Sequence, residues 1–171
     1  MSKQIKKIKY PYAEAYKIAL GVLEQLKPFC DRVEIAGSIR RKKAEIHDID
    51  LIAIPKPYEI GLFQSEIVNV INRWEKIMGE LPCKFTRRLL PSGVFLDLFL
   101  VDEKSFGQIF AIRTGSKEFN RNVLIKACNQ NGFKMVDGYL LKEGEKYEIR
   151  EEEDLFRMIG LPFVPPENRN L

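Results

Sequence analysis

Cysteine is scarce in this sequence, which holds only Cys30, Cys83 and Cys128. Their number is odd, their spacing is wide, and no two of them form a Cys-x-x-Cys pair. Disulfide frameworks rely on an even number of cysteines, and structural zinc sites rely on closely spaced pairs. The sequence therefore disfavours both, and we expect the three side chains to be ordinary packing thiols.

Long apolar runs are missing as well. No stretch approaches the roughly 20 apolar residues of a membrane-spanning helix, and no apolar signal segment follows the lysine-rich residues 1–9. We expect an intracellular protein, cytoplasmic or associated with a nucleoid, that has no membrane partner. With 45% hydrophobic and 30% charged residues, the 171-residue chain suits one compact domain, or a domain with a smaller lobe packed on it.

The net charge of +4 is modest for a protein that binds nucleic acid, but it is unevenly spread. Residues 105–135 hold five basic residues and one acidic residue, whereas residues 136–171 hold five basic and nine acidic residues. The basic stretch suits a surface that contacts phosphates. Two ordinary solvated surfaces would explain the same distribution.

Apolar periodicity predicts the elements of the first part of the chain. A helix is predicted over residues 12–26, before Pro28, and another over residues 65–78, before Gly79. Apolar runs at 32–36, 49–54 and 93–101 predict strands, and such strands between helices indicate an α/β layer. The expected inner faces of the helices are Tyr12, Tyr16, Ala19, Leu20, Leu23 and Leu26, and Ile67, Val70, Ile71, Trp74, Ile77 and Met78.

The pattern changes after a boundary near residues 102–105. Helices are predicted over 106–112 and 117–131, the latter with Ser116 as N-cap and Gly132 as C-terminal stop. We therefore expect two lobes, residues 1–103 and 104–171. The predicted elements that complete the second lobe are a hairpin over 133–150, an acidic helix over 151–159 and an extended tail over 161–171.

A short segment after the first predicted strand has residues suited to phosphate. Gly37 permits close approach of the backbone to a ligand, and Ser38 adds a hydroxyl and an N–H group. Arg40 and Arg41 follow at once, and guanidinium groups match phosphate oxygens. A Gly-Ser pair alone is usually only a turn.

Three aspartates give the strongest chemical signal. Asp48 and Asp50 begin a predicted strand, whose alternation sends both carboxylates to one face and Ile49 to the other. Asp97 stands in an apolar run typical of a buried central strand, where a charge needs a partner or a ligand. Neighbouring carboxylates repel each other unless a cation lies between them, and their oxygens suit Mg²⁺. Each feature alone is often structural, but together they indicate a site that can hold two metal ions with a nucleoside triphosphate.

The segment 37–50 resembles the Gly-Ser and Asp-x-Asp signature of the DNA polymerase beta nucleotidyltransferase superfamily, and Asp97 falls at its third acid. Thr114-Gly-Ser-Lys-Glu-Phe-Asn120 resembles the Thr-Gly-Ser-x-x-Phe-Asn motif of family X DNA polymerases. The likeness spans nearly the whole chain from about Tyr10. It implies an α/β (α+β) fold, with a polymerase beta-like nucleotidyltransferase palm and its mixed sheet in residues 1–103, and a small C-terminal thumb lobe in residues 104–171.

The resemblance also implies a function: a monomeric DNA-directed DNA polymerase that fills short gaps in DNA repair with two divalent ions, Mg²⁺ or Mn²⁺. Two alternatives stay open, a nucleotidyltransferase that works without a template or on another acceptor, and a DNA-end binding module without activity. The implied catalytic metal ligands are Asp48, Asp50 and Asp97; the implied ligands of the deoxynucleoside triphosphate are Gly37, Ser38, Arg41, Gly115 and Asn120; and the implied contacts to primer-template or gapped DNA are Lys117, Arg121, Lys126, Arg87 and Arg88.

The sequence departs from the family pattern at several positions. Ile112 and Arg113 replace the usual aromatic pair before Thr-Gly-Ser, which predicts weaker rejection of ribonucleotides. His47 stands where glycine is usual, and we expect it to pack against other side chains or to have a backbone role. Phe95 and Phe99 replace arginines that some members place beside the third acid, so we expect looser primer positioning. The chain resembles a minimal palm-and-thumb form known from a viral member, without the lyase and helix-hairpin-helix domains, and we expect weak, salt-sensitive DNA binding.

Overall fold

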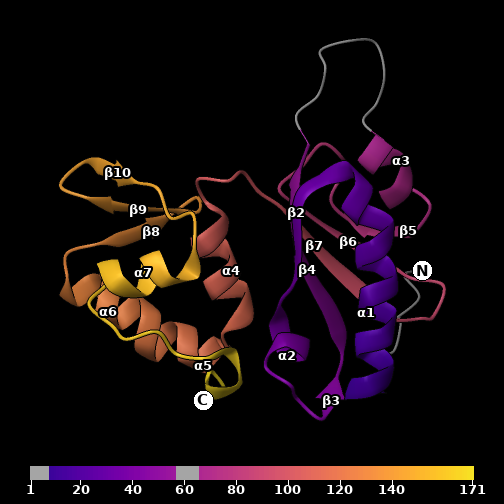
Figure 1. Cartoon of the computed structure of the whole chain (residues 1–171), viewed down its shortest axis with the longest axis horizontal. Helices are drawn as coiled ribbons and strands as arrows, with labels where there is room; N and C mark the ends of the chain where they lie inside the picture. Colours follow the sequence, from indigo (N-terminus) through magenta and orange to yellow (C-terminus); the bar gives the residue numbers. More distant parts are fainter. Residues whose placement is uncertain (1–7, 57–65) are drawn as a thin grey trace, which may run out of the picture.

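The computed structural model describes residues 8–56 and 66–171, which form two lobes joined by one connection (Figure 1). The N-terminal lobe is built on a five-stranded sheet, and the smaller C-terminal lobe on helices and a three-stranded sheet. Within these described ranges, no helix is long and apolar enough to cross a membrane.

The larger sheet is mixed, with strand order β2-β4-β7-β6-β5. The central strands β4 and β7 run parallel, and every other neighbouring pair is antiparallel. The predicted mixed α/β layer is therefore confirmed, and Asp97 lies on a central strand as expected. The strands are β2 (Cys30–Ile35), β4 (Asp48–Pro55), β5 (Glu75–Met78), β6 (Phe85–Leu89) and β7 (Phe95–Leu100).

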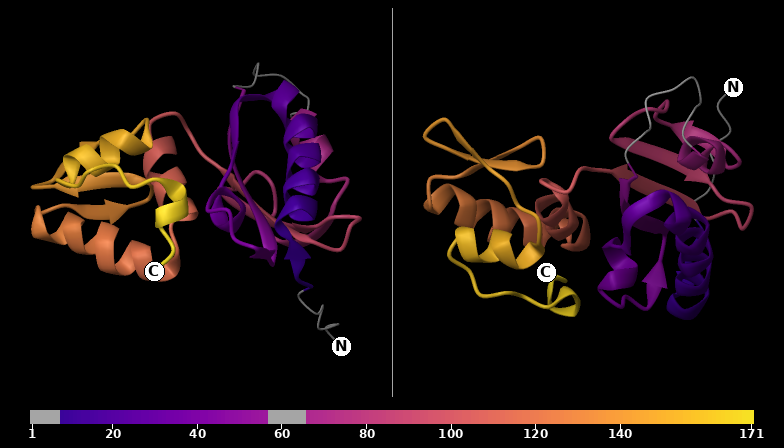
Figure 2. Two further views of the ribbon diagram at one scale, coloured as in Figure 1. Left: turned by 60° about the horizontal axis from the view of Figure 1, so that its bottom comes forward. Right: turned by 45° about the horizontal axis from the view of Figure 1, so that its top comes forward.

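The two faces of this sheet are covered differently. Helices α1 (Tyr12–Leu26) and α3 (Glu66–Ile71) pack on the face that carries Ile49 and Leu96. The opposite face carries Ile52 and Phe99, which pack against helix α4 (Phe106–Thr114) of the C-terminal lobe. Because the acids of β4 and β7 share this second face with Ile52 and Phe99, they lie on the side of the sheet that faces the C-terminal lobe. Figure 2 shows α1 along one side of the sheet and the C-terminal lobe on the other.

Helix α1 has the predicted bounds, but its predicted inner face was wrong in part, since Ala19 and Leu26 are buried whereas Tyr16 and Leu20 are exposed. The buried side chains are Ala15, Ala19, Val22 and Leu26, whereas Tyr16 is 39% exposed. Small residues let the helix approach the sheet closely, and the larger Tyr16 ring is left to stack on Tyr12 with centroids 5.7 Å apart.

The predicted second helix over 65–78 was wrong in its second half. Its first residue lies outside the described residues, the helix ends at Ile71, and residues Glu75–Met78 form the edge strand β5. Met78 is 58% exposed instead of facing inward. The reason is tertiary: β5 pairs with β6, a strand that the sequence had not predicted, and this pairing outweighs the helical spacing of the apolar residues.

The C-terminal lobe follows the predicted order of elements. Its first helix is α4 (Phe106–Thr114). The long predicted helix is present as α5 (Lys117–Phe119), a π-helical stretch η2 (Asn120–Ile125) and α6 (Lys126–Gln130). Ser116 caps it as predicted, because its hydroxyl accepts a hydrogen bond from the Phe119 N–H at 3.0 Å. A separate core of buried residues, including Phe119, Leu140 and Phe156, holds this lobe together.

The remaining elements differ slightly from expectation. The predicted hairpin has a third strand, and the tail is not extended throughout because Pro166–Asn168 form a 3-10 turn, η3. The strands are β8 (Lys134–Val136), β9 (Tyr139–Lys142) and β10 (Glu145–Tyr147), and α7 is Glu152–Met158. The small elements of the N-terminal lobe are β1 (Tyr10–Pro11), η1 (Lys27–Phe29), α2 (Gly37–Arg40) and β3 (Glu45–Ile46).

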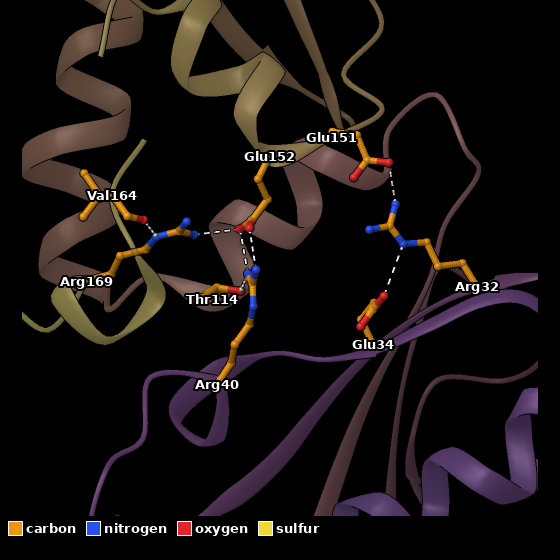
Figure 3. Close-up of polar contacts among 8 residues, drawn as sticks. All are labelled: Arg32, Glu34, Arg40, Thr114, Glu151, Glu152, Val164 and Arg169. Atoms are coloured by element: carbon orange, nitrogen blue, oxygen red, sulfur yellow. Dashed lines mark hydrogen bonds and ion pairs between the residues drawn. The ribbon is translucent and has the colours of Figure 1, made fainter. Parts of the chain in front are cut away.

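Charged residues tie the two lobes together (Figure 3). The Arg40 guanidinium donates to both carboxylate oxygens of Glu152 at 2.8 and 2.6 Å. The Arg169 guanidinium donates to Oε1 of the same carboxylate at 2.7 Å. A second tie lies nearby, where Arg32 donates to Glu151 at 2.7 Å. The start of α7 is thus fixed against the N-terminal lobe.

Candidate active site

The register of β4 and β7 brings the three predicted acids onto one face of the sheet. Asp50 lies opposite Asp97, and Asp48 lies two residues before Asp50 on the same face. Ile49, between them, is 0% exposed on the other face, as alternation along the strand predicts. Three carboxylates therefore stand on two adjacent strands.

These carboxylates interact strongly. Burial, followed by the nearby charges of Asp48 and Asp97, raises the pKa of Asp50 to about 8, against the opposing effect of Arg113 and Arg41. Ionising such a carboxyl group at neutral pH costs free energy unless a positive charge lies close to it. The site therefore favours a cation.

One cation, the Arg87 guanidinium, already lies among the acids. Arg87 is the cross-strand neighbour of Asp97 on β6. Its Nε donates to Asp97 Oδ1 and its Nη2 to Asp97 Oδ2, both at 2.5 Å, and Nη2 is 3.7 Å from Asp48 Oδ2. The hydrogen bond to Asp97 raises the pKa of Arg87. The sequence alone does not reveal this pair, because the antiparallel register of β6 and β7 brings the two residues together.

The three acids nevertheless suit a divalent metal ion. Among residues 8–56 and 66–171, no three His, Cys, Asp or Glu side chains converge as a formed metal cage. The donors are all carboxylate oxygens, which hard cations such as Mg²⁺ prefer, and the charge of Asp50 is only partly compensated. The donor set therefore fits a metal whose remaining ligands come from substrate and water.

The glycine turn after β2 packs directly against one of these acids. Gly37 has a φ of +60°, a conformation that residues with a Cβ rarely adopt. A Cβ placed on it would lie 1.9 Å from Asp50 Oδ2. Only glycine therefore allows the turn that carries Ser38 to approach the carboxylates.

A pocket of about 370 Å³ opens beside the acids and is lined by both lobes. All five residues predicted to bind the nucleotide line it, together with Asp48 and Asp50; Asp97 is not part of this lining. The volume lies within the usual range for small-molecule sites. The lining residues are Gly37, Ser38, Arg41, Asp48 and Asp50 of the N-terminal lobe, and Ile112, Arg113, Gly115, Ser116, Lys117 and Asn120 of the C-terminal lobe.

Two residues of the second lobe are closely fitted to each other in this pocket. A Cβ on Gly115 would lie 2.2 Å from Asn120 Oδ1, so a larger residue there would displace the Asn120 side chain. The Asn120 amide donates to the Ile112 carbonyl at 2.7 Å. Its Oδ1 is buried and accepts no hydrogen bond from the described residues, so an unsatisfied acceptor lies behind the wall of the pocket.

Comparisons with known proteins agree with this geometry. The structure superposes on polymerase beta of Leishmania infantum, in structures described as a ternary P/T complex and a ternary gap complex, with TM-scores of 0.76 and 0.77. These matches cover 98% and 96% of this chain and 78% and 71% of those chains, at 22% and 21% identity, and show the fold. A family model described as DNA polymerase beta thumb matches residues 110–170.

Curated proteins match the sequence as well. DNA polymerase/3'-5' exonuclease PolX of Bacillus subtilis is 26% identical over 168 residues, which are 94% of this chain and 28% of that protein. DNA polymerase IV of Saccharomyces cerevisiae is 37% identical over 78 residues, 44% of this chain and 13% of that protein. The resemblance to family X DNA polymerases is confirmed. The chain spans less than a third of the length of these curated relatives. The lobe with the five-stranded sheet is called the palm below, and the C-terminal lobe the thumb.

The basic residues predicted to contact DNA lie in different surroundings. Lys117, Arg121 and Lys126 are exposed on the thumb, and Arg121 and Lys126 line a shallow surface depression with several amide side chains. Arg88 corrects the prediction, since it is only 2% exposed and its Nε donates to Thr86. Alternation along β6 sends Arg87 to the face of the acids and Arg88 to the helix-covered core, so Arg88 does not face a DNA strand. The expected packing of His47 is also wrong, because His47 is exposed.

Proposed function

We propose that this chain is a DNA-directed DNA polymerase that adds deoxynucleotides to a primer 3′ hydroxyl by a two-metal mechanism and fills short gaps during DNA repair. The single observation that supports this best is the pocket in which the glycine turn and Arg41 of the palm meet Gly115 and Asn120 of the thumb, beside two carboxylates. The names of the curated relatives, which are DNA polymerases, support the same reaction.

Asp48, Asp50 and Asp97 are the proposed ligands of two divalent ions, Mg²⁺ or Mn²⁺. When bound, such ions lower the pKa of an attacking hydroxyl and neutralise a leaving pyrophosphate. In this assignment, the palm residues Gly37, Ser38 and Arg41 hold the phosphates, because an open backbone turn and a guanidinium fork suit their oxygens.

The thumb residues complete the proposed substrate site. Gly115 lies against the sugar, and Asn120 contacts the nucleotide from the helix that begins after Ser116. Lys117, Arg121 and Lys126 contact DNA phosphates from the exposed surface of the thumb. Arg87 keeps its Nη1 free of hydrogen bonds to the described residues, so it can contact the primer strand while it holds Asp97. We assign residues 1–103 to the palm and 104–171 to the thumb.

The test combines binding with extension on the same DNA. Wild-type protein and Asp50→Asn are compared on gapped and blunt primers with each deoxynucleotide and with Mg²⁺ or Mn²⁺. We expect both to bind DNA and only the wild type to extend the gapped primer. Extension of blunt primers without a template would support an untemplated transferase, and binding without extension by the wild type would support a non-catalytic DNA-end binding module.

A further inference from the structure

The phosphate-binding arginine of the palm is held by the thumb. Arg41 Nε donates to Asn170 Oδ1 at 2.8 Å, and Arg41 Nη1 donates to the Thr114 carbonyl at 2.5 Å. Its Nη2 makes no hydrogen bond to the residues that the structure describes. The guanidinium is therefore fixed at two nitrogens, and its third remains available at the wall of the pocket.

The tail that carries Asn170 is itself a fixed structure. Asn170 Nδ2 donates to the carbonyl of Glu167, a residue of the 3-10 turn over Pro166–Asn168, at 2.9 Å. The preceding residue, Arg169, is 0% exposed, and its guanidinium bonds to Glu152 and to the Val164 carbonyl. A buried ion pair thus anchors the chain immediately before Asn170.

Two consecutive palm residues therefore meet two consecutive tail residues. Arg40 reaches Arg169 through the shared carboxylate of Glu152, as Figure 3 shows. Arg41 reaches Asn170 directly. The first contact joins the lobes, and the second one determines where the Arg41 guanidinium lies.

We propose that Asn170 is a positioning residue for the triphosphate: together with the Thr114 carbonyl, it holds Arg41 so that Nη2 is aimed at the phosphate oxygens of the incoming nucleotide. This inference rests on the proposed function. A free arginine side chain loses much rotational freedom when it binds a ligand, and prior fixation reduces that loss. The tail thereby raises triphosphate affinity without touching the nucleotide.

The experiment measures nucleotide affinity without chemistry. The full-length protein is bound to one-nucleotide gapped DNA whose primer ends in a dideoxynucleotide, and the matching deoxynucleoside triphosphate is titrated with Mg²⁺. We expect Asn170→Ala and the similarly sized Asn170→Leu to weaken affinity by about 3- to 10-fold, the factor for releasing one flexible side chain. Asn168→Ala is the matched control, because Asn168 is an exposed tail residue whose side chain makes no hydrogen bond to the described residues.

A double-mutant cycle separates positioning from a general structural effect. In an Arg41→Ala background, Asn170→Ala should have no further effect on triphosphate affinity, whereas a general loosening of the thumb would still lower it. Melting temperatures of all variants check the fold. If the wild type binds no nucleotide, the proposed function fails. If the wild type binds and both Asn170 variants match Asn168→Ala, or if the effects are additive with Arg41→Ala, the positioning role of Asn170 is wrong.

Discussion

Removal of the buried Glu152 carboxylate, which joins the two lobes, should destabilise the protein strongly. Glu152 is 3% exposed and accepts three hydrogen bonds, two from Arg40 and one from Arg169. In Glu152→Ala, the guanidinium of Arg169, which is 0% exposed, loses its carboxylate partner but stays buried. Breaking a buried pair by removing one partner costs about 3–5 kcal/mol, because the remaining charge is uncompensated.

The expected change is large enough to measure by melting. For a chain of this size, each kcal/mol shifts the melting temperature by about 2–4 °C, so Glu152→Ala should melt roughly 6–20 °C below the wild type. Glu153→Ala is the matched control, since Glu153 is exposed and neighbours Glu152 on the same helix. A shift in Glu152→Ala no larger than that of Glu153→Ala would refute the reasoning.

The same ion pair predicts a pH dependence. Burial raises the pKa of Glu152, but the hydrogen bonds and charges of Arg40 and Arg169 outweigh it, and the net pKa lies below its ordinary value. A depressed pKa stabilises the folded state above the unfolded-state pKa, and this stabilisation is lost as the pH falls through the folded-state value. The difference in unfolding free energy between wild type and Glu152→Gln, measured by urea denaturation, should therefore be full at pH 7 and shrink under acid conditions. If this difference in unfolding free energy grew toward low pH, the pKa of Glu152 in the folded state would not be lowered.

Three further predictions concern the site. Asp97→Asn should bind gapped DNA as the wild type does but lose primer extension, and extension near the wild-type rate would contradict its role as a metal ligand. Gly37→Ala should abolish nucleotide binding, because its Cβ would overlap Asp50, whereas Gly21→Ala, with open space around it, should not; equal effects would refute the steric argument. Ile112 and Arg113 replace the usual aromatic pair, so the ratio of kcat/KM for a deoxynucleotide to that for the matching ribonucleotide should be smaller than is usual in the family. A ratio well above about 10⁴ would contradict this prediction.

The sequence alone predicted that Asp48 and Asp50 lie on one face of the sheet, because this depends only on neighbouring residues of one strand. Alternation along one strand is enough to put Asp48 and Asp50 on the same side. The pairing of Arg87 with Asp97 depends on the register between β6 and β7, and no spacing along the chain encodes it. For the same reason, the half-buried Arg87 beside the acids could not be told from its buried successor Arg88 until β6 had been located.

The second helix and the tail show the same limit. Ile77 and Met78 continue the helical spacing of the apolar residues before them, yet the hydrogen bonds of an edge strand decide the conformation of residues 75–78. The tail resembled an extended segment because of its prolines, and nothing in its composition indicated that Arg169 would be buried or that Asn170 would reach Arg41. Both depend on contacts between segments far apart in the sequence.

Single-turnover incorporation on one-nucleotide gapped DNA tests the central claim most directly. Four substrates differ only in the templating base, and each is offered all four deoxynucleotides separately with Mg²⁺. A DNA-directed polymerase should add one nucleotide, with the complementary one fastest on each template, and Asp50→Asn should add none. Incorporation whose nucleotide preference is the same on all four templates, or no incorporation by wild-type protein that binds the DNA, would contradict the account.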